Sequence, residues 1–335
     1  MFAASAAGAE PYRFLTYNAE LTRKGPGLLV RDLMRFEDAA LIETLQRIVE
    51  LKPDVATLQS FDFDHNHVAL QLVQDRLAEL GHTMPYRFAL MPNAGRSTGF
   101  DLDRDGKLDT ASDRQGYGQF LGQGGVAILS RHPIEAQAAK DLSALLWKDL
   151  PGAHLPGDYF TAQELDILRL HGVAAWDVPV HLPSGTVHVL AVQASSPVFD
   201  GPENRNGLRN ADQLRFWDDY VSKMEQPFVL MGGLNNDPFD GEGLSPPLRS
   251  LLGNPALQDT RPRSAPRDVQ DPLHLGPTLE DTVDWGRKIG SLRVDYVLPS
   301  AGLEVVASGV DWGDDAQNHE DAPAHRPVWV DLTLP

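Results

Sequence analysis

An aspartate-rich segment, DLDRDGKLD (101–109), has the residue types and the spacing of a calcium-binding loop. Such loops place oxygen ligands at positions 1, 3, 5, 7 and 9 and a glycine at the sharp turn of position 6. We therefore expect a structural Ca²⁺ bound by Asp101, Asp103, Asp105, Lys107 (through its carbonyl) and Asp109. The alternative is a solvated acidic turn, because Ser112 stands where the twelfth-position glutamate is usual.

A second group of metal-ligand types follows in FDFDHNH (61–67). Carboxylates and imidazoles bind many divalent cations. Alternate residues of an extended segment point apart, however, so a solvated turn that leads into the next helix is the favoured interpretation. The residues concerned are Asp62, Asp64, His65 and His67.

Two arginines in GPENRNGLRN (201–210) form a candidate anion site. Arg205 and Arg209 precede a predicted helix, and a helix N-terminus favours negative charge. We expect them to bind substrate. The alternative is a polar loop whose arginines offset nearby acids.

Hydrophobic periodicity predicts alternating strands and helices, with no linker long enough to separate two domains. Residues 92–123 read as a long loop. Asn210 is the predicted N-cap of the third helix, with Asp212 in its first turn. The predicted strands are 12–17, 55–59, 126–130, 178–182, 187–192, 228–232, 293–298 and 327–332, and the predicted helices are 38–51, 68–80 and 210–224.

Six segments together resemble the endonuclease/exonuclease/phosphatase superfamily, which includes DNase I-like nucleases and sphingomyelinases. They are DVATLQS (54–60), GGVAILSRHPI (124–134), VLAVQASSPVFDG (189–201), PFVLMGGLNNDP (227–238), RVDYVLPS (293–300) and APAHRPVWVDL (322–332). The resemblance implies a DNase I-like α/β (α+β) fold, in which two packed, mostly antiparallel β-sheets are flanked by helices in a four-layer αββα sandwich. It also implies a single domain over 12–335 after a disordered N-terminal remnant, 1–11.

The same resemblance assigns roles to individual residues. Family members hydrolyse phosphoesters with a carboxylate-held Mg²⁺ or Mn²⁺, two histidines, and Asp and Asn residues that orient them. By position, the implied catalytic residues are Asn18, Asn235, Asp295 and His325. Gln59 and Gln193 stand at positions implied to contact substrate.

Four positions depart from the family pattern. Ser60 replaces the metal-binding glutamate, and a hydroxyl is a poor ligand for a hard dication, which argues against the usual Mg²⁺ or Mn²⁺ site. Gln193 replaces a histidine and can donate a hydrogen bond but carries no charge. Gly233 replaces the aspartate that orients water, and Ala324 replaces the aspartate before His325. We expect His325 to be a weaker base without that carboxylate.

Three hypotheses remain open. The first is a metal-dependent phosphoester hydrolase with a rebuilt site. The second is a non-catalytic pseudoenzyme that binds a small phosphorylated or anionic ligand. The third, which rests on residues 101–109 alone, is a calcium-dependent interaction protein outside the cytoplasm.

Composition limits the partners and the compartment. The net charge of −18 argues against nucleic acid, because binding to its backbone depends on Lys and Arg. No apolar stretch is long enough for a membrane span, and the absence of cysteine excludes disulfides. Ala7-Gly8-Ala9 has the small-x-small form of a signal-peptidase site, so we expect a periplasmic or secreted protein whose signal peptide has been removed. A cytoplasmic location stays open.

Overall fold

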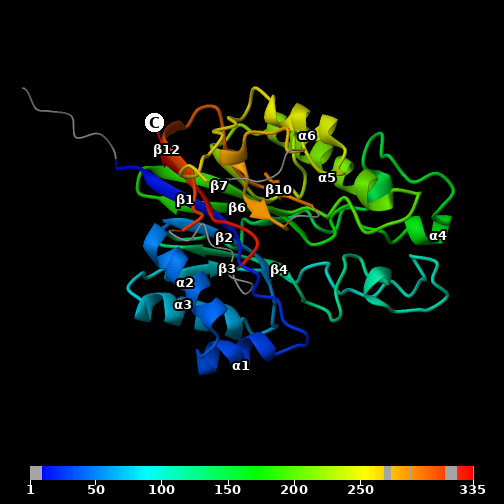
Figure 1. Ribbon diagram of the computed structural model, residues 1–335, viewed down its shortest axis with the longest axis horizontal. Helices are drawn as coiled ribbons and strands as arrows, with labels where there is room; N and C mark the ends of the chain where they lie inside the picture. Colours follow the sequence, from blue (N-terminus) through cyan, green and yellow to red (C-terminus); the bar gives the residue numbers. More distant parts are fainter. Residues whose placement is uncertain (1–9, 268–272, 287–288, 314–322, 335) are drawn as a thin grey trace, which may run out of the picture.

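Two β-sheets pack face to face, and helices cover the outer face of each (Figure 1). The computed structural model describes residues 10–267, 273–286, 289–313 and 323–334. The predicted four-layer arrangement is confirmed, although each main sheet contains one parallel strand pair among its antiparallel ones. The predicted disordered remnant lies, up to residue 9, outside the described residues, and the single-domain boundary 12–335 stays a prediction.

The first sheet has the strand order β12-β13-β1-β2-β4-β3. Its central strand β1 is buried on both faces, because one face meets the second sheet and the other meets helices. β1 runs parallel to β2 and antiparallel to β13. The strands are β1 (Tyr12–Asn18), β2 (Val55–Phe61), β3 (Tyr86–Phe88), β4 (Gly125–Ser130), β12 (Glu304–Val310) and β13 (Val328–Thr333).

The second sheet has the strand order β11-β8-β7-β6-β5. β7 runs parallel to β8, and the other pairs are antiparallel. The strands are β5 (Lys140–Asp141), β6 (Ala174–Leu182), β7 (Gly185–Gln193), β8 (Phe228–Gly233) and β11 (Asp295–Pro299). A separate two-stranded sheet pairs β9 (Val283–Asp284) with β10 (Ser291–Leu292).

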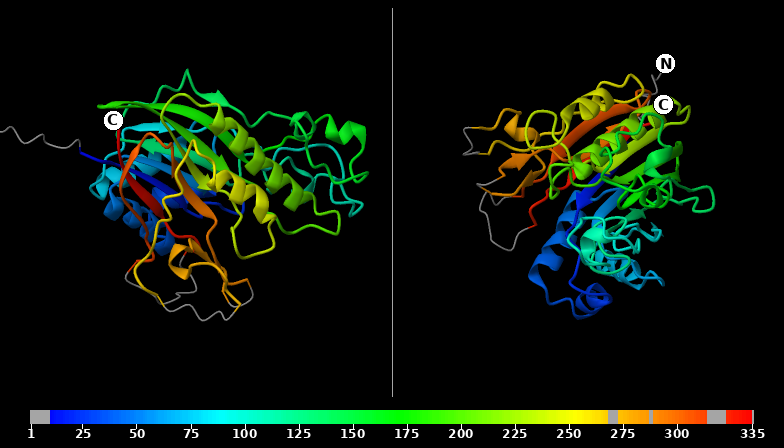
Figure 2. Two further views of the ribbon diagram at one scale, coloured as in Figure 1. Left: turned by 90° about the horizontal axis from the view of Figure 1, so that it is seen from above. Right: turned by 90° about the vertical axis from the view of Figure 1, so that its right-hand side faces the viewer.

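The helices form the two outer layers, as the perpendicular views show (Figure 2). α1 (Leu28–Arg35), α2 (Ala39–Leu51) and α3 (Val68–Glu79) cover the first sheet, and α5 (Arg205–Ser222) and α6 (Ser245–Leu252) cover the second. Short turns of helix are α4 (Ala162–Leu165), η1 (Ala111–Asp113), η2 (Trp147–Asp149) and η3 (Thr278–Glu280). Within the described part of the chain, no helix is long and apolar enough to cross a membrane.

α5 corrects one sequence-based prediction. It begins at Arg205 and not after Asn210, because Asn204, in the left-handed region, caps the helix six residues earlier. Asn210 is therefore no N-cap. Its buried amide donates to the carbonyls of Ser195 (2.8 Å) and Leu234 (2.9 Å), which follow β7 and β8. Asp212, which is also buried, accepts from Trp147 Nε1 at 2.8 Å.

The segments 92–123 and 143–170 form a lobe beyond the ends of the sheets, on the right in Figure 1. A small hydrophobic cluster holds the lobe together, and the bond between Trp147 and Asp212 joins it to α5. The buried members of this cluster are Leu102, Trp147, Leu150, Phe160, Leu168 and Leu170.

The two parallel pairs bring the candidate site residues to one edge of the sandwich. Parallel strands end on the same side, so Asn18 lies opposite Gln59 at the ends of β1 and β2. Gln193 likewise lies opposite Gly233 at the ends of β7 and β8. The antiparallel β11 begins at this edge, where Asp295 pairs with Gly233.

Candidate active site

A buried chain of hydrogen bonds crosses from one sheet to the other at this edge. Asn18, at the end of β1, lies with Nδ2 3.1 Å from Nε2 of His325. His325 Nδ1 lies 2.7 Å from Oδ2 of Asp295, at the start of β11. Three of the four predicted catalytic residues are therefore in contact.

The environment of His325 defines its tautomer and its charge. An ionised carboxylate only accepts, so Nδ1 carries a proton toward Asp295 and Nε2 presents a lone pair to the Asn18 amide. Burial disfavours the imidazolium, but the Asp295 carboxylate outweighs this effect and raises the pKa of His325 above its ordinary value. On protonation, Asn18 must turn its amide to offer Oδ1, which has no partner in the present orientation.

This geometry corrects the expectation drawn from Ala324. His325 does not lack a carboxylate, because Asp295 supplies one from another strand, 30 residues away in sequence. A second acid, Glu20, reaches the backbone of the same segment. Glu20 Oε1 accepts from the amide of Ala324 at 2.7 Å and from that of His325 at 3.4 Å.

Sequence reasoning missed three residues that support this chain. Thr282 donates to Asp295 Oδ2 at 3.0 Å and accepts from the amides at the start of β11, which fixes the carboxylate. Trp285 packs edge-on against the imidazole of His325, at 5.6 Å between ring centres. Glu20 had a detectable signal, since it is an acid two residues after the strand-end Asn18. Thr282 and Trp285 offered none, because only tertiary packing brings them here.

Gln193 and Gly233 form a complementary pair. A Cβ atom on Gly233 would lie 2.4 Å from Oε1 of Gln193, so the glutamine occupies the space beside the missing side chain. Gln193 is 8% exposed, and its Oε1 has no hydrogen-bond partner. Asn235 follows with a positive φ of 52°, a conformation that asparagine tolerates. Its Nδ2 donates to the Ala194 carbonyl at 2.6 Å.

Two positions on β2 behave differently from their predicted roles. Gln59 is fully buried, and its amide exchanges hydrogen bonds with Thr16 and Thr57 at 2.9–3.2 Å. The predicted contact of Gln59 with a substrate does not fit this geometry, because the side chain is buried and its amide is already hydrogen-bonded. Ser60 lies in a β-bulge with a positive φ of 54°, which interrupts the alternation of the strand at this edge.

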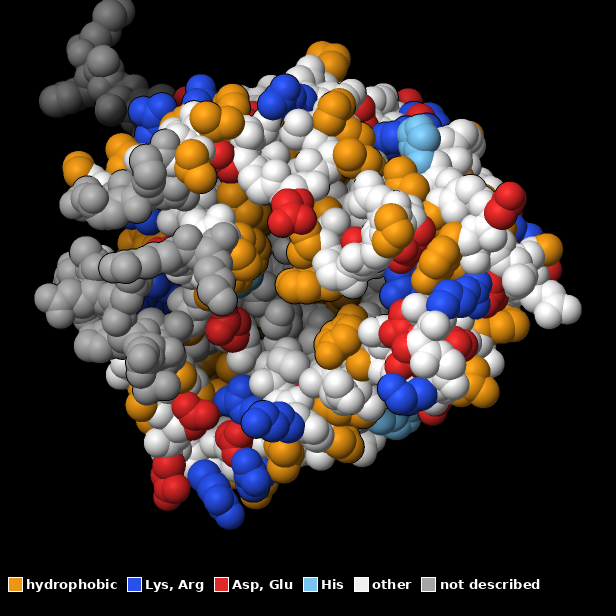
Figure 3. Space-filling model, turned by 45° about the vertical axis from the view of Figure 1, so that its right-hand side comes forward, with side chains coloured by type: hydrophobic (Ala, Val, Ile, Leu, Met, Phe, Trp, Pro, Cys, Tyr) orange, Lys and Arg blue, Asp and Glu red, His pale blue; other side chains and the backbone are white. Residues whose placement is uncertain are grey.

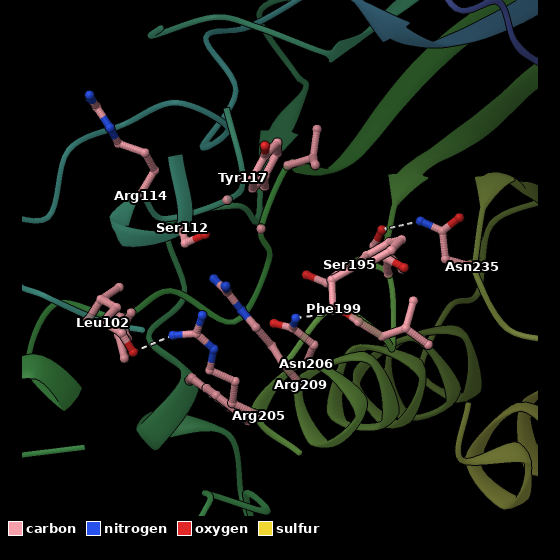
Figure 4. A pocket seen from close by; sticks show the side chains of 18 of the residues that line it. Leu102, Ser112, Arg114, Tyr117, Ser195, Phe199, Arg205, Asn206, Arg209 and Asn235 are labelled. Atoms are coloured by element: carbon pink, nitrogen blue, oxygen red, sulfur yellow. Dashed lines mark hydrogen bonds between the residues drawn. The ribbon is translucent and has the colours of Figure 1, made fainter. Parts of the chain in front are cut away.

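A cavity of about 620 Å³ opens beside the strand ends. Its lining includes Gln193, and Figure 4 shows Asn235 at one end and Arg205 and Arg209 of α5 at the other. Small-molecule sites typically measure roughly 300–1,000 Å³. The cavity therefore has the size of a site for a small ligand, and it brings four predicted site residues together.

The acids and histidines of residues 61–67 do not gather into a metal site. Asp62 accepts from the amides of Arg23 (2.7 Å) and Gly124 (3.0 Å). Asp64 accepts from the amides of Val68 and Ala69 at 2.8 Å and so supports the start of α3. These carboxylates organise the backbone, which agrees with the favoured interpretation of a turn.

The calcium-like loop is partly assembled. Carboxylate oxygens of Asp101, Asp103 and Asp105 lie within 4.8 Å of one another. Asp109 does not belong to this group and instead accepts from Ser97 Oγ at 2.7 Å. Lys107 Nζ lies 3.0 Å from Asp105 Oδ2, where it offsets part of the negative charge. The structure thus assembles three of the five predicted ligands into a group that is compatible with a divalent cation.

The comparison with protein families identifies the chain. The sequence profile described as "Endonuclease/Exonuclease/phosphatase family" matches residues 15–318. The chain belongs to this family. A search of curated proteins found no match.

Several solved structures share the fold at low sequence identity. A family protein from Beutenbergia cavernae DSM 12333 superposes with a TM-score of 0.56 at 20% identity, over 97% of this chain and 72% of that one. Sphingomyelinase C from Streptomyces griseocarneus has a TM-score of 0.51 at 20% identity, over 96% of this chain and 99% of that one. Beta toxin from Staphylococcus aureus, in a structure with bound magnesium ions, has a TM-score of 0.51 at 14% identity, over 97% of this chain and 100% of that one. The predicted DNase I-like fold is confirmed, and at these identities the likeness establishes the fold alone.

The residues present do not fit the magnesium or manganese site that the family implies. Gly233 and Ala324 offer no side-chain ligand, and Ser60 offers only a hydroxyl. Among the described residues, three acidic or imidazole groups come within ligand distance of one another only at Asp101, Asp103 and Asp105, outside this edge. The buried Oδ1 atoms of Asn18 and Asp295 have no hydrogen-bond partner. One amide oxygen and one carboxylate oxygen are too few to replace the ligands of the family's metal site.

The Asp295–His325 pair makes a prediction about pH. Because Asp295 raises the pKa of His325 in the folded protein, the protonated imidazole stabilises the fold at pH values below the unfolded pKa of about 6.5. That contribution is lost as the pH rises through the folded pKa. We expect Asp295→Asn to lower the pKa of His325 and to remove this part of the pH dependence. The measurements are an NMR titration of the imidazole, assigned with His325→Gln, and urea unfolding across this range.

Asp166→Asn is the matched control, because it removes an exposed carboxylate that pairs with Lys148. It should leave the titration of His325 unchanged. An unaltered pKa of His325 in Asp295→Asn would contradict the role given to the buried pair.

Proposed function

We propose that the protein is a hydrolase of small phosphorylated molecules that uses His325 as its acid–base group. The observation that carries the proposal is the position of His325 between Asp295 and Asn18, at 2.7 and 3.1 Å. A general base needs a lone pair that can accept the proton and a partner that orients it. Asp295 orients the imidazole of His325, and the Nε2 lone pair accepts the proton of water once the Asn18 amide turns away from it.

In this proposal the chain's own residues divide the chemistry. Water attacks phosphorus and its proton passes to Nε2 of His325. The P–O bond to the leaving group breaks, and the leaving oxygen takes the electron pair and then the proton from the imidazolium. Asp295 stabilises the imidazolium through Nδ1. Asn18 and Asn235 donate to phosphoryl oxygens, and Gln193 adds an uncharged donor at the cavity end. No step passes through a metal at this edge, because the donor set there does not fit one.

Loss of the acid–base group should abolish turnover. We expect wild-type protein to hydrolyse generic phosphomonoesters or phosphodiesters, and the double variant Asn235→Ala, His325→Ala to lose about 100-fold or more of that rate. Release of phosphate or p-nitrophenol is followed with Mg²⁺, Mn²⁺, Ca²⁺, Zn²⁺ or chelator present. His181→Ala, which removes an exposed histidine paired with Glu135, is the control. A wild type that is inert under every condition would refute the hydrolase.

The second candidate is a pseudoenzyme that binds the same class of ligand without turnover. The specific observation in its favour is the fit between Gln193 and Gly233. A neutral amide fills the space beside the position where the family carries an acid. Such a pocket holds a phosphoryl group but lacks a carboxylate to orient the attacking water.

Restoring the family's residues tests how these positions were matched to the family's site. Gly233→Asp brings its Cβ against Gln193, so the substitutions must be made together as Ser60→Glu, Gln193→His, Gly233→Asp and Ala324→Asp. We expect the combined variant to bind Mg²⁺ or Mn²⁺ and to gain metal-dependent hydrolysis, measured by calorimetry and phosphate release. A variant that folds and binds metal but gains no hydrolysis over wild type would show that these positions are wrongly matched to the family's site.

We also propose that residues 101–106 bind Ca²⁺ and stabilise the lobe, as expected for a protein outside the cytoplasm. The support is the convergence of Asp101, Asp103 and Asp105, whose carboxylate oxygens accept, within the described residues, from amides of their own loop and from Lys107 Nζ.

Calcium should therefore raise the thermal stability of the protein. A ligand at about 100 times its Kd stabilises a fold by about 2.7 kcal/mol. We expect Ca²⁺ to raise the Tm of wild type, measured by calorimetry after chelation, and to have no effect on the double variant Asp103→Asn, Asp105→Asn. Asp219→Asn, an exposed acid paired with Lys223, should respond like wild type. Equal responses in all three proteins would exclude the loop as the site.

A further inference from the structure

The cavity beside the strand ends is cationic in a strongly acidic protein. The chain carries a net charge of −18. The charged side chains that line the cavity in the described segments are nevertheless all arginines, namely Arg114, Arg205 and Arg209. Arg114 turns its guanidinium away, toward the carbonyls of Gly95 and Asp109 (Figure 4). The local field within the cavity is therefore set by Arg205 and Arg209.

These two arginines form an incompletely compensated pair. They lie one turn apart on α5, where like charges repel. Arg209 donates to the carbonyls of Leu170, at 3.0 Å, and Arg169, and no carboxylate pairs with it among the described residues. Burial and then the neighbouring Arg205 lower the pKa of Arg209 to about 10.

Arg205 is little better paired. It donates to the Leu102 carbonyl, and its closest carboxylate, Glu203, lies 3.8 Å from a buried Nε that makes no hydrogen bond. A bound anion would accept from both guanidinium groups and relieve their repulsion.

The arginines lie at the opposite end of the cavity from the phosphoryl-binding residues. Figure 4 shows Asn235 on one side and the two guanidinium groups on the other, with Ser195, Phe199 and Asn206 between them. At the Asn235 end, the cavity is lined by the neutral amides of Asn235 and Gln193. The cavity of about 620 Å³ is far larger than one phosphate ion, so each end has room for a group of its own.

The walls between the two ends are largely apolar. Trp147, Phe160 and Leu168 of the lobe cluster line the interior. Tyr117 and Phe199 also line the cavity and are 73% and 85% exposed, which places them at its rim. With the lobe side brought forward, the surface is hollowed near the centre of the view, and hydrophobic side chains gather around the hollow (Figure 3). Aromatic walls favour a planar or apolar body in the ligand.

We infer that the ligand is a small organic molecule with two anionic groups on an apolar or planar body. A phosphoryl group lies at Asn235 and Gln193, and a second acid, either carboxylate or phosphate, lies at Arg205 and Arg209. This inference rests on the proposed function for its phosphoryl end, and it adds the second acid and the body that joins the two.

Matched probes that resist hydrolysis test the inference in wild-type protein. They are phenylphosphonate, with one anionic group, 4-carboxyphenylphosphonate, with a second carboxylate, and benzene-1,4-diphosphonate, with a second phosphonate. Affinities are measured by titration calorimetry. We expect at least one of the two-headed probes to bind about tenfold or more tightly than phenylphosphonate. The tighter of the two identifies the chemistry of the second acid.

Variants test whether Arg209 and Arg205 cause the tighter binding of the two-headed probes. Arg209→Gln should abolish the preference for two-headed probes and leave phenylphosphonate binding within about twofold, and Arg205→Gln serves as the second test if the first does not fold. Lys223→Gln removes a cation from the exposed end of the same helix and should keep the preference. Asn235→Ala should weaken all three probes together.

The outcomes separate the two proposals. Equal affinity of wild type for all three probes would overturn the two-acid ligand and leave phosphoryl binding intact. A preference that survives in both arginine variants would also overturn it. Absence of binding for every probe would overturn the proposed phosphoryl site, and the inference with it.

Discussion

The hydrogen-bond chain Asn18–His325–Asp295 couples the two sheets at the edge where chemistry is proposed. Asn18 ends β1 in the first sheet, Asp295 begins β11 in the second, and His325 lies between them. Buried polar groups are costly unless they are paired, so this arrangement persists only if both sheets keep their relative position. Thr282 and Glu20 add support from two further segments. The geometry of the site therefore depends directly on how the two sheets pack against each other.

The four substitutions differ in their effect on the hydrogen bonds among Asn18, His325 and Asp295. Ala324 leaves the imidazole paired, because its carboxylate partner comes from β11. Ser60, Gly233 and Ala324 together remove the donors that a dication needs, while the proton-handling pair is kept. Gln193 and Gly233 compensate each other in volume. The residues at this edge therefore suit the proposed acid–base chemistry better than the family's metal chemistry.

The lobe and α5 together shape the cavity at this edge. Residues 92–123 and 143–170 build their own apolar cluster and attach to α5 through Trp147 and Asp212. The cluster closes one side of the cavity, and α5 supplies the arginines. A negative surface around a small cationic cavity would repel large polyanions, yet a small anion that enters would meet concentrated positive potential.

Local patterns predicted much of the framework. The strands 12–17, 55–59 and 228–232 and the helices 38–51 and 68–80 were recognisable because their periodicity and end signals reflect local physics. The start of α5 was not recognisable in this way. Asn210 resembles an N-cap in the sequence, but its side chain donates to the carbonyls that follow β7 and β8.

The sequence by itself determined the family framework, the net charge and the identity of the substituted positions. Only the tertiary structure decided that Asp295 is the hydrogen-bond partner of His325. It also decided that the Gln59 amide is bonded to Thr16 and Thr57. Finally, it placed Arg205 and Arg209 in one cavity with Asn235. The reason is physical: side-chain partners far apart in the chain meet only where strand direction and register bring their ends together, and these are set by packing across the whole sandwich.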